Sequence, residues 1–198
     1  MLTVLDFEFN QAFDFGDGNK EPNPDCRFEI IQIGAVKLNN SFNITDEFSV
    51  NIKPRLYPRI HPYVEKITGL TNSDFNNSPY FEEAYSSFRK FIGDDNILGT
   101  WGYSDIKALF RNITFNHIVK PPVIINYVDI QKMATQQIKY SRGGSIGLKN
   151  AVEAFNITID ESKHFHNAIA DAYYTAEVLK RIKPEKLPVR IFNSNHIK

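Results

Sequence analysis

The chain has 198 residues, of which 42% are hydrophobic and 23% charged, so it has the composition of one globular domain with an apolar core. Its 23 basic and 23 acidic residues cancel, and charge alone therefore assigns no partner. A single cysteine, Cys26, excludes an intramolecular disulfide. No apolar run reaches the roughly 18 residues of a membrane span, and the first residues lack the basic region of a signal peptide. We expect a cytoplasmic protein with no membrane partner.

Three apolar runs predict strands at the start of the chain: residues 2–9, 28–38 and about 47–52. Turn residues separate the second and third runs, which favours a three-stranded antiparallel meander. Residues 10–27 are rich in Gly, Asp, Asn and Pro and predict a long surface loop. Loops of this length are uncommon in compact domains and are often functional.

From residue 61 onwards helical spacing dominates and alternates with short strands. Helices are predicted after residues 61 and 71, over 81–92, from 104, over 129–138, from Ser145 to 155 and over 167–182, and strands over 97–101 and 123–128. This order predicts an α/β fold, a mixed five-stranded sheet flanked by helices. We expect residues 1–183 to form the domain and the weakly patterned residues 184–198 to be a C-terminal extension.

Asp6 and Glu8 are the first candidates for chemistry. Side chains two positions apart in a strand lie on the same face, so both carboxylates are expected side by side, with Leu5 and Phe7 on the other face. Two adjacent carboxylates on a buried strand repel each other unless a cation compensates them. Taken alone, the pair fits a solvent-exposed sheet end equally well.

His166 and Asp171 flank the start of the last predicted helix. On a regular helix a spacing of five residues places two side chains roughly 140° apart, so they face one site only if His166 lies on the entry loop. A histidine there is a candidate general base. Asp105 likewise begins a helix after a short strand. Taken singly, each acid is also explained by stabilisation of a helix N-terminus.

Together, four carboxylates that converge without basic partners form the hard-oxygen ligand set that Mg²⁺ or Mn²⁺ prefers. Two such ions roughly 3.5–4 Å apart can support hydrolysis of a phosphodiester. The order Asp6-x-Glu8, Asp105, His166-x4-Asp171 resembles the DEDDh 3′–5′ exonucleases of the ribonuclease H-like superfamily. The segments EIIQIGAVKL, IHPYVEKITGLTNSDF and GGSIGLKNAVEAFNI extend the resemblance over residues 2–182. It is greatest to the Eri-type branch, and it extends to bacterial members described as inhibitors of a sporulation kinase pathway.

The resemblance implies roles for individual residues. Asp6, Glu8 and Asp171 would ligate one metal ion, while Asp6 and, largely through water, Asp105 would hold a second. His166 is the implied general base, although a shift of register would exchange it with His164. In related enzymes the segment that corresponds to Ile67, Thr68, Gly69 and Leu70 lines the pocket of the terminal nucleotide. Asn10 is a further expected substrate contact, at a position where the family commonly has a threonine. Gly69 is equally explained as a helix C-cap.

The function implied is a metal-dependent exonuclease with two Mg²⁺ or Mn²⁺ ions that acts on the 3′ ends of single-stranded RNA or DNA and releases 5′-mononucleotides. The alternative is a regulatory or binding protein that retains this fold and acts through protein partners, and a third is a metal-binding domain without hydrolysis. The complete set of five site residues argues against the regulatory alternative.

Overall fold

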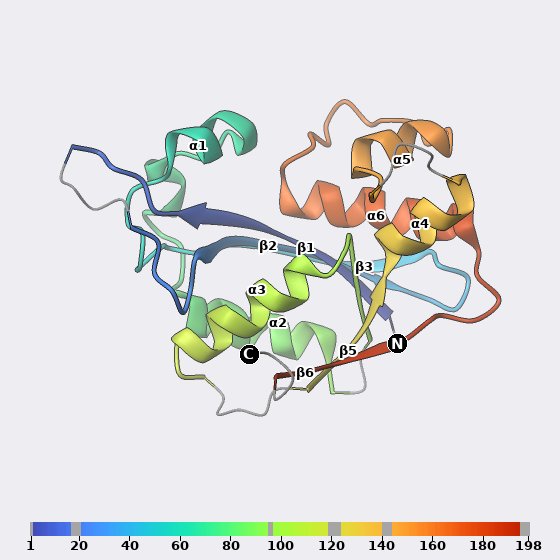
Figure 1. The fold of residues 1–198 in the computed structure, drawn as a ribbon, viewed down its shortest axis with the longest axis horizontal. Helices are drawn as coiled ribbons and strands as arrows, with labels where there is room; N and C mark the ends of the chain where they lie inside the picture. Colours follow the sequence, from blue (N-terminus) through green and yellow to red (C-terminus); the bar gives the residue numbers. More distant parts are fainter. Residues whose placement is uncertain (1, 17–20, 95–96, 119–123, 140–143, 195–198) are drawn as a thin grey trace.

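The computed structural model of the protein describes residues 2–16, 21–94, 97–118, 124–139 and 144–194. In these parts of the chain a mixed sheet lies between two groups of helices (Figure 1). The elements follow in the order β1 (Leu2–Gln11), β2 (Phe28–Leu38), β3 (Ile44–Asn51), α1 (Pro62–Thr68), a 3₁₀ helix (Asn72–Phe75), α2 (Phe81–Ile92), β4 (Ile97–Thr100), α3 (Ser104–Phe115), β5 (Ile124–Asp129), α4 (Ile130–Ile138), α5 (Leu148–Ala154), α6 (Ala168–Ile182) and β6 (Arg190–Asn193).

The sheet has six strands in the order β3-β2-β1-β4-β5-β6. The first three strands form the antiparallel meander that the sequence predicts, and β2 has the predicted bounds. Strand β1 pairs in parallel with β4, and β4 in parallel with β5. Because β1 lies inside the sheet and alternates apolar side chains to both faces, it needs cover on both sides.

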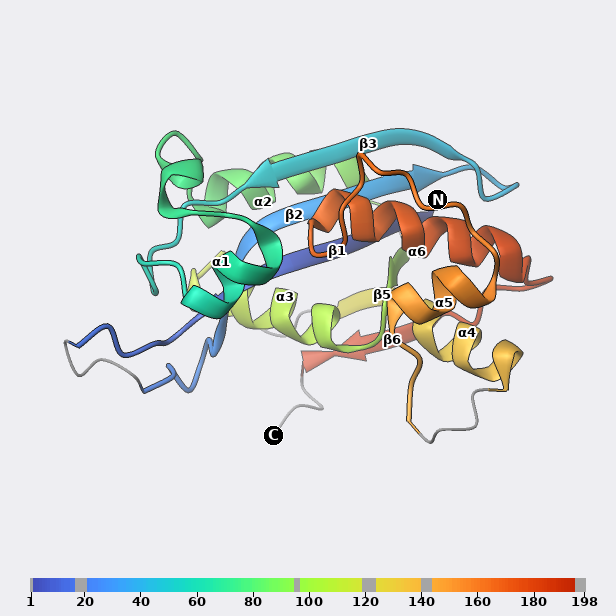
Figure 2. The ribbon, with the colours of Figure 1, turned by 90° about the horizontal axis from the view of Figure 1, so that it is seen from above.

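Two apolar cores supply this cover. Val4 of β1 joins the core under α4, α5 and α6, whereas Leu5 and Phe7 join the core under α2 and α3. Figure 2 shows α6 lying along β1 and β2. Helix α1 lies on the same side of the sheet, beyond the N-terminal end of α6. The alternation predicted for β1 is therefore confirmed, and it directs Asp6 and Glu8 away from the α2–α3 core.

Two local expectations are corrected. The fold class is confirmed, but the sheet has a sixth strand, β6, which pairs antiparallel with β5 inside the segment expected to be only an extension. Helix α5 begins at Leu148 after Gly147 rather than at Ser145. None of the helices in the described residues is long and apolar enough to cross a membrane.

Candidate active site

The centre of the site is a group of three carboxylates. Asp6 and Glu8 project from β1, and Asp171 projects from the first turn of α6. One carboxylate oxygen from each lies within 4.8 Å of the corresponding oxygens of the other two. Glu8 and Asp171 are buried and Asp6 is half-buried. The strand alternation and the helix start therefore bring together three of the four acids that the sequence predicts.

Asp105 approaches this group from another element. It is buried in the first turn of α3, which follows the carboxyl end of β4, the parallel neighbour of β1. Burial is the main cause of the raised pKa of Asp6 and of Glu8, and the charge of Asp105 raises both further. Asp105 thus completes the acidic cluster, although it is not among the three residues whose oxygens lie within 4.8 Å of one another.

Close packing of α6 on β2 fixes the position of Asp171. A Cβ atom on Gly34 would lie 2.1 Å from backbone atoms of Ala168 and Ile169, so only glycine allows this approach. The Gln32 side chain accepts a hydrogen bond from the Ala168 N–H at 2.8 Å, which satisfies one of the free N–H groups at the helix start. These contacts make Gln32 and Gly34 positioning residues for the first turn of α6.

His166 lies two residues before α6, on the entry loop, as the spacing required. Its backbone is left-handed, with φ of 64°, and its N–H donates to Asp171 Oδ2 at 3.1 Å. This turn curls the loop back toward the acids and leaves the imidazole exposed. His164 is exposed as well, but the bond to Asp171 belongs to His166.

Burial raises the pKa of every acid in the cluster, and the charges of neighbouring acids raise it further for Asp6, Glu8 and Asp105. Burial is the largest cause in each case, and it raises the pKa of Glu8 to about 8, of Asp105 to about 7 and of Asp171 to about 6. The pKa of Asp6 is also raised, first by burial and then by the charges of Asp105, Asp171 and Glu8. No lysine or arginine of the described residues forms an ion pair with any of the four.

The residues present fit a divalent cation. Asp171 Oδ1 is buried and has no hydrogen-bond partner in the described structure, which is costly for a carboxylate oxygen. A cation beside it would satisfy this oxygen and compensate the repulsion between the acids. An all-oxygen donor set of this kind suits Mg²⁺ or Mn²⁺ better than softer metals.

Asn10 has a structural role that was not predicted from sequence. Its side chain is fully buried, donates to the carbonyls of Tyr57 and Arg59 at 2.8 and 2.9 Å, and accepts from the His61 N–H at 2.9 Å. These three hydrogen bonds hold the segment that leads into α1, and they use both N–H donors of the amide and one of the two acceptor positions of its oxygen. Asn10 therefore connects β1 to the segment that precedes α1. The contact of Asn10 with a substrate stays a prediction.

Glu29 holds the same segment and was not singled out from sequence. Its buried carboxylate accepts hydrogen bonds from the N–H groups of Arg55, Leu56 and Tyr57 at 2.7, 2.9 and 2.8 Å. Glu29 and Gln32 are polar residues in the mostly apolar and buried first half of β2, and this pattern could have indicated their roles from sequence.

The end of α1 contains the expected nucleotide-binding segment. Gly69 caps the helix in a left-handed conformation, and the Thr68 hydroxyl donates to the Val64 carbonyl at 2.8 Å and accepts from the Leu70 N–H at 3.0 Å. Ile67 and Leu70 are half-buried. The C-cap explanation of Gly69 is confirmed, and the contact of residues 67–70 with a nucleotide stays a prediction.

The sheet order, with acids from β1 and from the first turns of α3 and α6, defines a ribonuclease H-like domain with a DEDDh-type acidic cluster. A sequence model of the family described as Exonuclease matches residues 3–179. The chain therefore belongs to the exonuclease family, a family of hydrolytic enzymes, and the resemblance stated from sequence is confirmed.

Two curated relatives illustrate the family. The chain is 29% identical over 163 residues to the DNA polymerase III subunit epsilon of Aquifex aeolicus (strain VF5), a match covering 79% of this chain and 73% of that protein. It is 28% identical over 121 residues to the probable 3′-5′ exonuclease KapD of Bacillus subtilis (strain 168), covering 61% of this chain and 56% of KapD. The matched region is thus only part of each relative.

Solved structures share the fold at lower identity. The nuclease domain of 3′hExo, described as a DEDDh family member bound to rAMP, superposes with a TM-score of 0.77 at 21% identity and covers 96% of this chain and 95% of that one. A 3′-exonuclease in a structure of histone mRNA stem-loop recognition gives 0.77 at 18% identity, over 97% of this chain and 89% of the other. At these identities the likeness shows the fold alone.

Proposed function

We propose that this protein is a metal-dependent 3′–5′ exonuclease that removes nucleotides from the 3′ ends of single-stranded RNA, DNA or both. Four converging carboxylates without a basic partner carry the proposal, because a structural role does not explain so much buried, mutually repelling charge. The 3′–5′ direction is supported by KapD, named a probable 3′-5′ exonuclease, and by the structural neighbours named 3′-exonucleases.

Asp6, Glu8 and Asp171 are the residues that would hold one Mg²⁺ or Mn²⁺ ion. Asp6 would also reach a second ion, and Asp105 would contribute to it largely through water. When bound, such a pair of ions activates water and stabilises the leaving oxygen of a phosphodiester. We assign the whole catalytic unit to residues 1–183 and regard residues 184–198 as an extension that supplies the edge strand β6.

His166 is the proposed general base. The hydrogen bond from its backbone to Asp171 fixes the loop, so the exposed imidazole stays at the edge of the acidic cluster. There it can take the proton from the attacking water and pass it to solvent. Burial raises the pKa of Asp171, but the hydrogen bond from the His166 backbone N–H lowers it again, which keeps that acid more ionised than its burial alone would allow.

Residues 67–70 are the proposed contacts of the terminal nucleotide. Ile67 and Leu70 present partly exposed apolar surface at the end of α1, and such a surface accepts any base. Sequence-tolerant recognition suits an enzyme that removes nucleotides one after another. The neighbours that bind rAMP or a histone mRNA stem-loop support a nucleic-acid substrate, but do not distinguish RNA from DNA here.

Hydrolysis of 5′-labelled RNA and DNA oligonucleotides of equal sequence tests the proposal. We expect a ladder that shortens from the 3′ end with Mn²⁺ or Mg²⁺, no cleavage in a chelator, and no cleavage by Asp6→Ala. The matched control is Asp46→Ala, which removes an exposed acid on β3. The comparison of the two strands reports the sugar preference.

The proposal fails if the folded protein binds Mn²⁺ but cleaves neither strand, an outcome that would favour the regulatory alternative. It also fails if Asp6→Ala cleaves as fast as Asp46→Ala, because hydrolysis would then not depend on the acidic cluster.

A further inference from the structure

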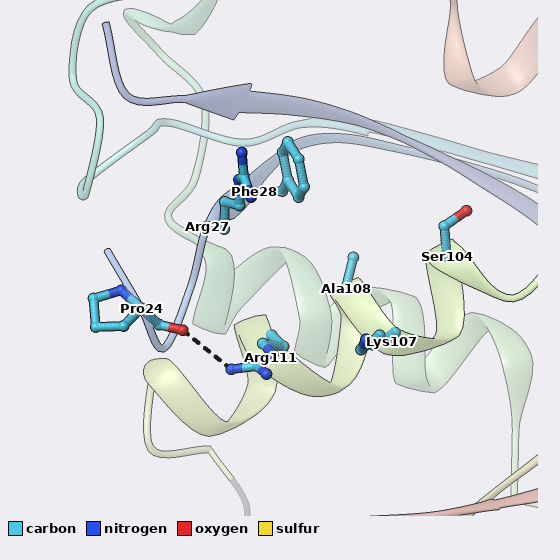
Figure 3. Close-up of a pocket in the computed structure, with 7 residues that line it drawn as sticks. All are labelled: Pro24, Arg27, Phe28, Ser104, Lys107, Ala108 and Arg111. Atoms are coloured by element: carbon cyan, nitrogen blue, oxygen red, sulfur yellow. Dashed lines mark hydrogen bonds between the residues drawn. The ribbon is translucent and has the colours of Figure 1, made fainter. Parts of the chain in front are cut away.

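A groove of about 370 Å³ lies beside the acidic cluster and has no role in the function described so far. Pro24, Arg27 and Phe28 form one wall, and Ser104, Lys107 and Arg111 of α3 form the other (Figure 3). Its volume is within the range of roughly 300–1,000 Å³ that is usual for small-ligand sites.

The helix wall is a single stripe of α3. Lys107, Ala108 and Arg111 follow Ser104 by three, four and seven residues, so all four share one face of the helix. The opposite face carries Ile106, Leu109 and Ile113, which are buried in the core. The stripe spans about 10 Å along the helix axis. The small side chain of Ala108 keeps the middle of the groove open.

The groove is positively charged. Arg27, Lys107 and Arg111 line it, no acidic side chain does, and none of the three cations forms an ion pair with a carboxylate of the described residues. Arg111 is held in place by the carbonyls of Pro24 and Asp25, to which its guanidinium donates at 3.2 and 3.4 Å. Such cations are available to phosphate groups.

Phe28 adds an aromatic surface to the same groove. Its side chain is 44% exposed, and the Arg27 guanidinium lies 5.6 Å from the ring centroid. One side of the ring packs against Phe9 at a centroid distance of 6.2 Å, which holds its orientation. A positive groove with an anchored aromatic ring is the combination that binds single-stranded nucleic acid through phosphates and a stacked base.

The groove starts at the catalytic cluster, since Ser104 precedes Asp105. We infer that it binds the nucleotides on the 5′ side of the scissile phosphate, with a base on Phe28 and backbone phosphates on Lys107 and Arg111. This inference rests on the proposed function, in which the 3′-terminal nucleotide occupies the cluster and the strand continues only in the 5′ direction. The groove is separate from residues 67–70, because α1 and α3 lie on opposite sides of the sheet (Figure 1).

Substrate length distinguishes this groove from the active site. The p-nitrophenyl ester of thymidine 5′-monophosphate reaches only the cluster, whereas an eight-nucleotide strand also reaches the groove. We expect the loss of kcat/KM in Lys107→Gln to grow from the ester to the eight-mer, reaching about tenfold or more. Lys90→Gln, which removes an exposed lysine of α2 outside the groove, should match the parent at every length. An equal loss at all lengths, or none, overturns the inference.

Binding of the eight-mer in a chelator provides a test that does not need turnover. Removal of one phosphate contact lowers the slope of log Kd against log salt concentration by about 0.7 for a single strand. We expect this change for Lys107→Gln and for Arg111→Gln, but not for Lys90→Gln. Phe28→Leu, which keeps an apolar contact with Phe9, should weaken binding about 5- to 150-fold, the equivalent of about 1–3 kcal/mol for one stacked base.

The two proposals fail in different ways. If the parent hydrolyses neither ester nor strand with Mn²⁺, the proposed function is wrong, and the salt slopes still decide the groove. If the parent is active but its groove variants keep the parental slope and length dependence, the function stands and the groove inference is wrong.

Discussion

Asp105 allows the energetic account of the acidic cluster to be tested quantitatively. Burial raises its pKa to about 7, against an ordinary value near 4. A carboxyl group with a higher pKa in the folded state binds more protons there than in the unfolded chain. The free energy of unfolding therefore falls as pH rises between the two values, and a difference of about 3 in pKa corresponds to at most about 4 kcal/mol by pH 8.

The substitution Asp105→Asn keeps the shape of the side chain and removes its charge. In a chelator at pH 8 we expect urea denaturation to give this variant a free energy of unfolding about 2–4 kcal/mol above that of the parent. Near pH 4 the difference should be under about 1 kcal/mol, because the parental carboxyl is then protonated in the folded state. A variant that is no more stable than the parent at pH 8, or equally stabilised at both pH values, would refute the reasoning.

Added Mn²⁺ should reduce this difference in stability. A ligand at a hundred times its Kd stabilises the folded state by about 2.7 kcal/mol, so the parent gains stability at pH 8 where its acids are ionised. Asp105→Asn should gain less, since it has lost one of the negative charges that favour the cation. An equal gain in both proteins would show that Asp105 does not act on the metal site.

Three further predictions concern residues that act on or position this site. His166→Asn, which keeps a residue that tolerates positive φ, should slow nucleotide release at least about 100-fold while Mn²⁺ binding measured by calorimetry stays within twofold. Gly34→Ala should lower the free energy of unfolding by about 1–3 kcal/mol or more in urea denaturation and should also lower activity, whereas Gly147→Ala, with open space at its Cβ, should do neither. Glu29→Gln should cost about 1.5–3 kcal/mol in the same assay, because the charge that accepts three backbone N–H groups is lost; an unchanged midpoint would contradict the role given to Glu29.

Much of the site could be predicted because it depends on local periodicity. Alternation in β1 places Asp6 and Glu8 on one face, and the start of α6 at Ala168 places His166 on its entry loop. These relations involve residues close together in sequence, where geometry follows from the type of element. The resemblance to the exonuclease family then supplied the expectation that Asp105 and Asp171 meet them.

The parts that sequence did not reveal depend on distant contacts. The amide of Asn10 bonds to backbone groups 47–51 residues away, and the residue type alone did not indicate this structural role. Gln32 supports Ala168 from 136 residues away. Strand β6 is only four residues long and its Ile191 is exposed, so its hydrophobic pattern was too weak to predict a strand. The segment becomes a strand because it pairs with β5.

The most direct test of the central claim compares two curves recorded in one buffer: Mn²⁺ binding by calorimetry and the initial rate of 3′-nucleotide release against Mn²⁺ concentration. We predict that the rate follows occupancy of the site and that Asp171→Asn loses both binding and release. Full release in a chelator, or an Asp171→Asn protein that binds Mn²⁺ and hydrolyses like the parent, would contradict the account.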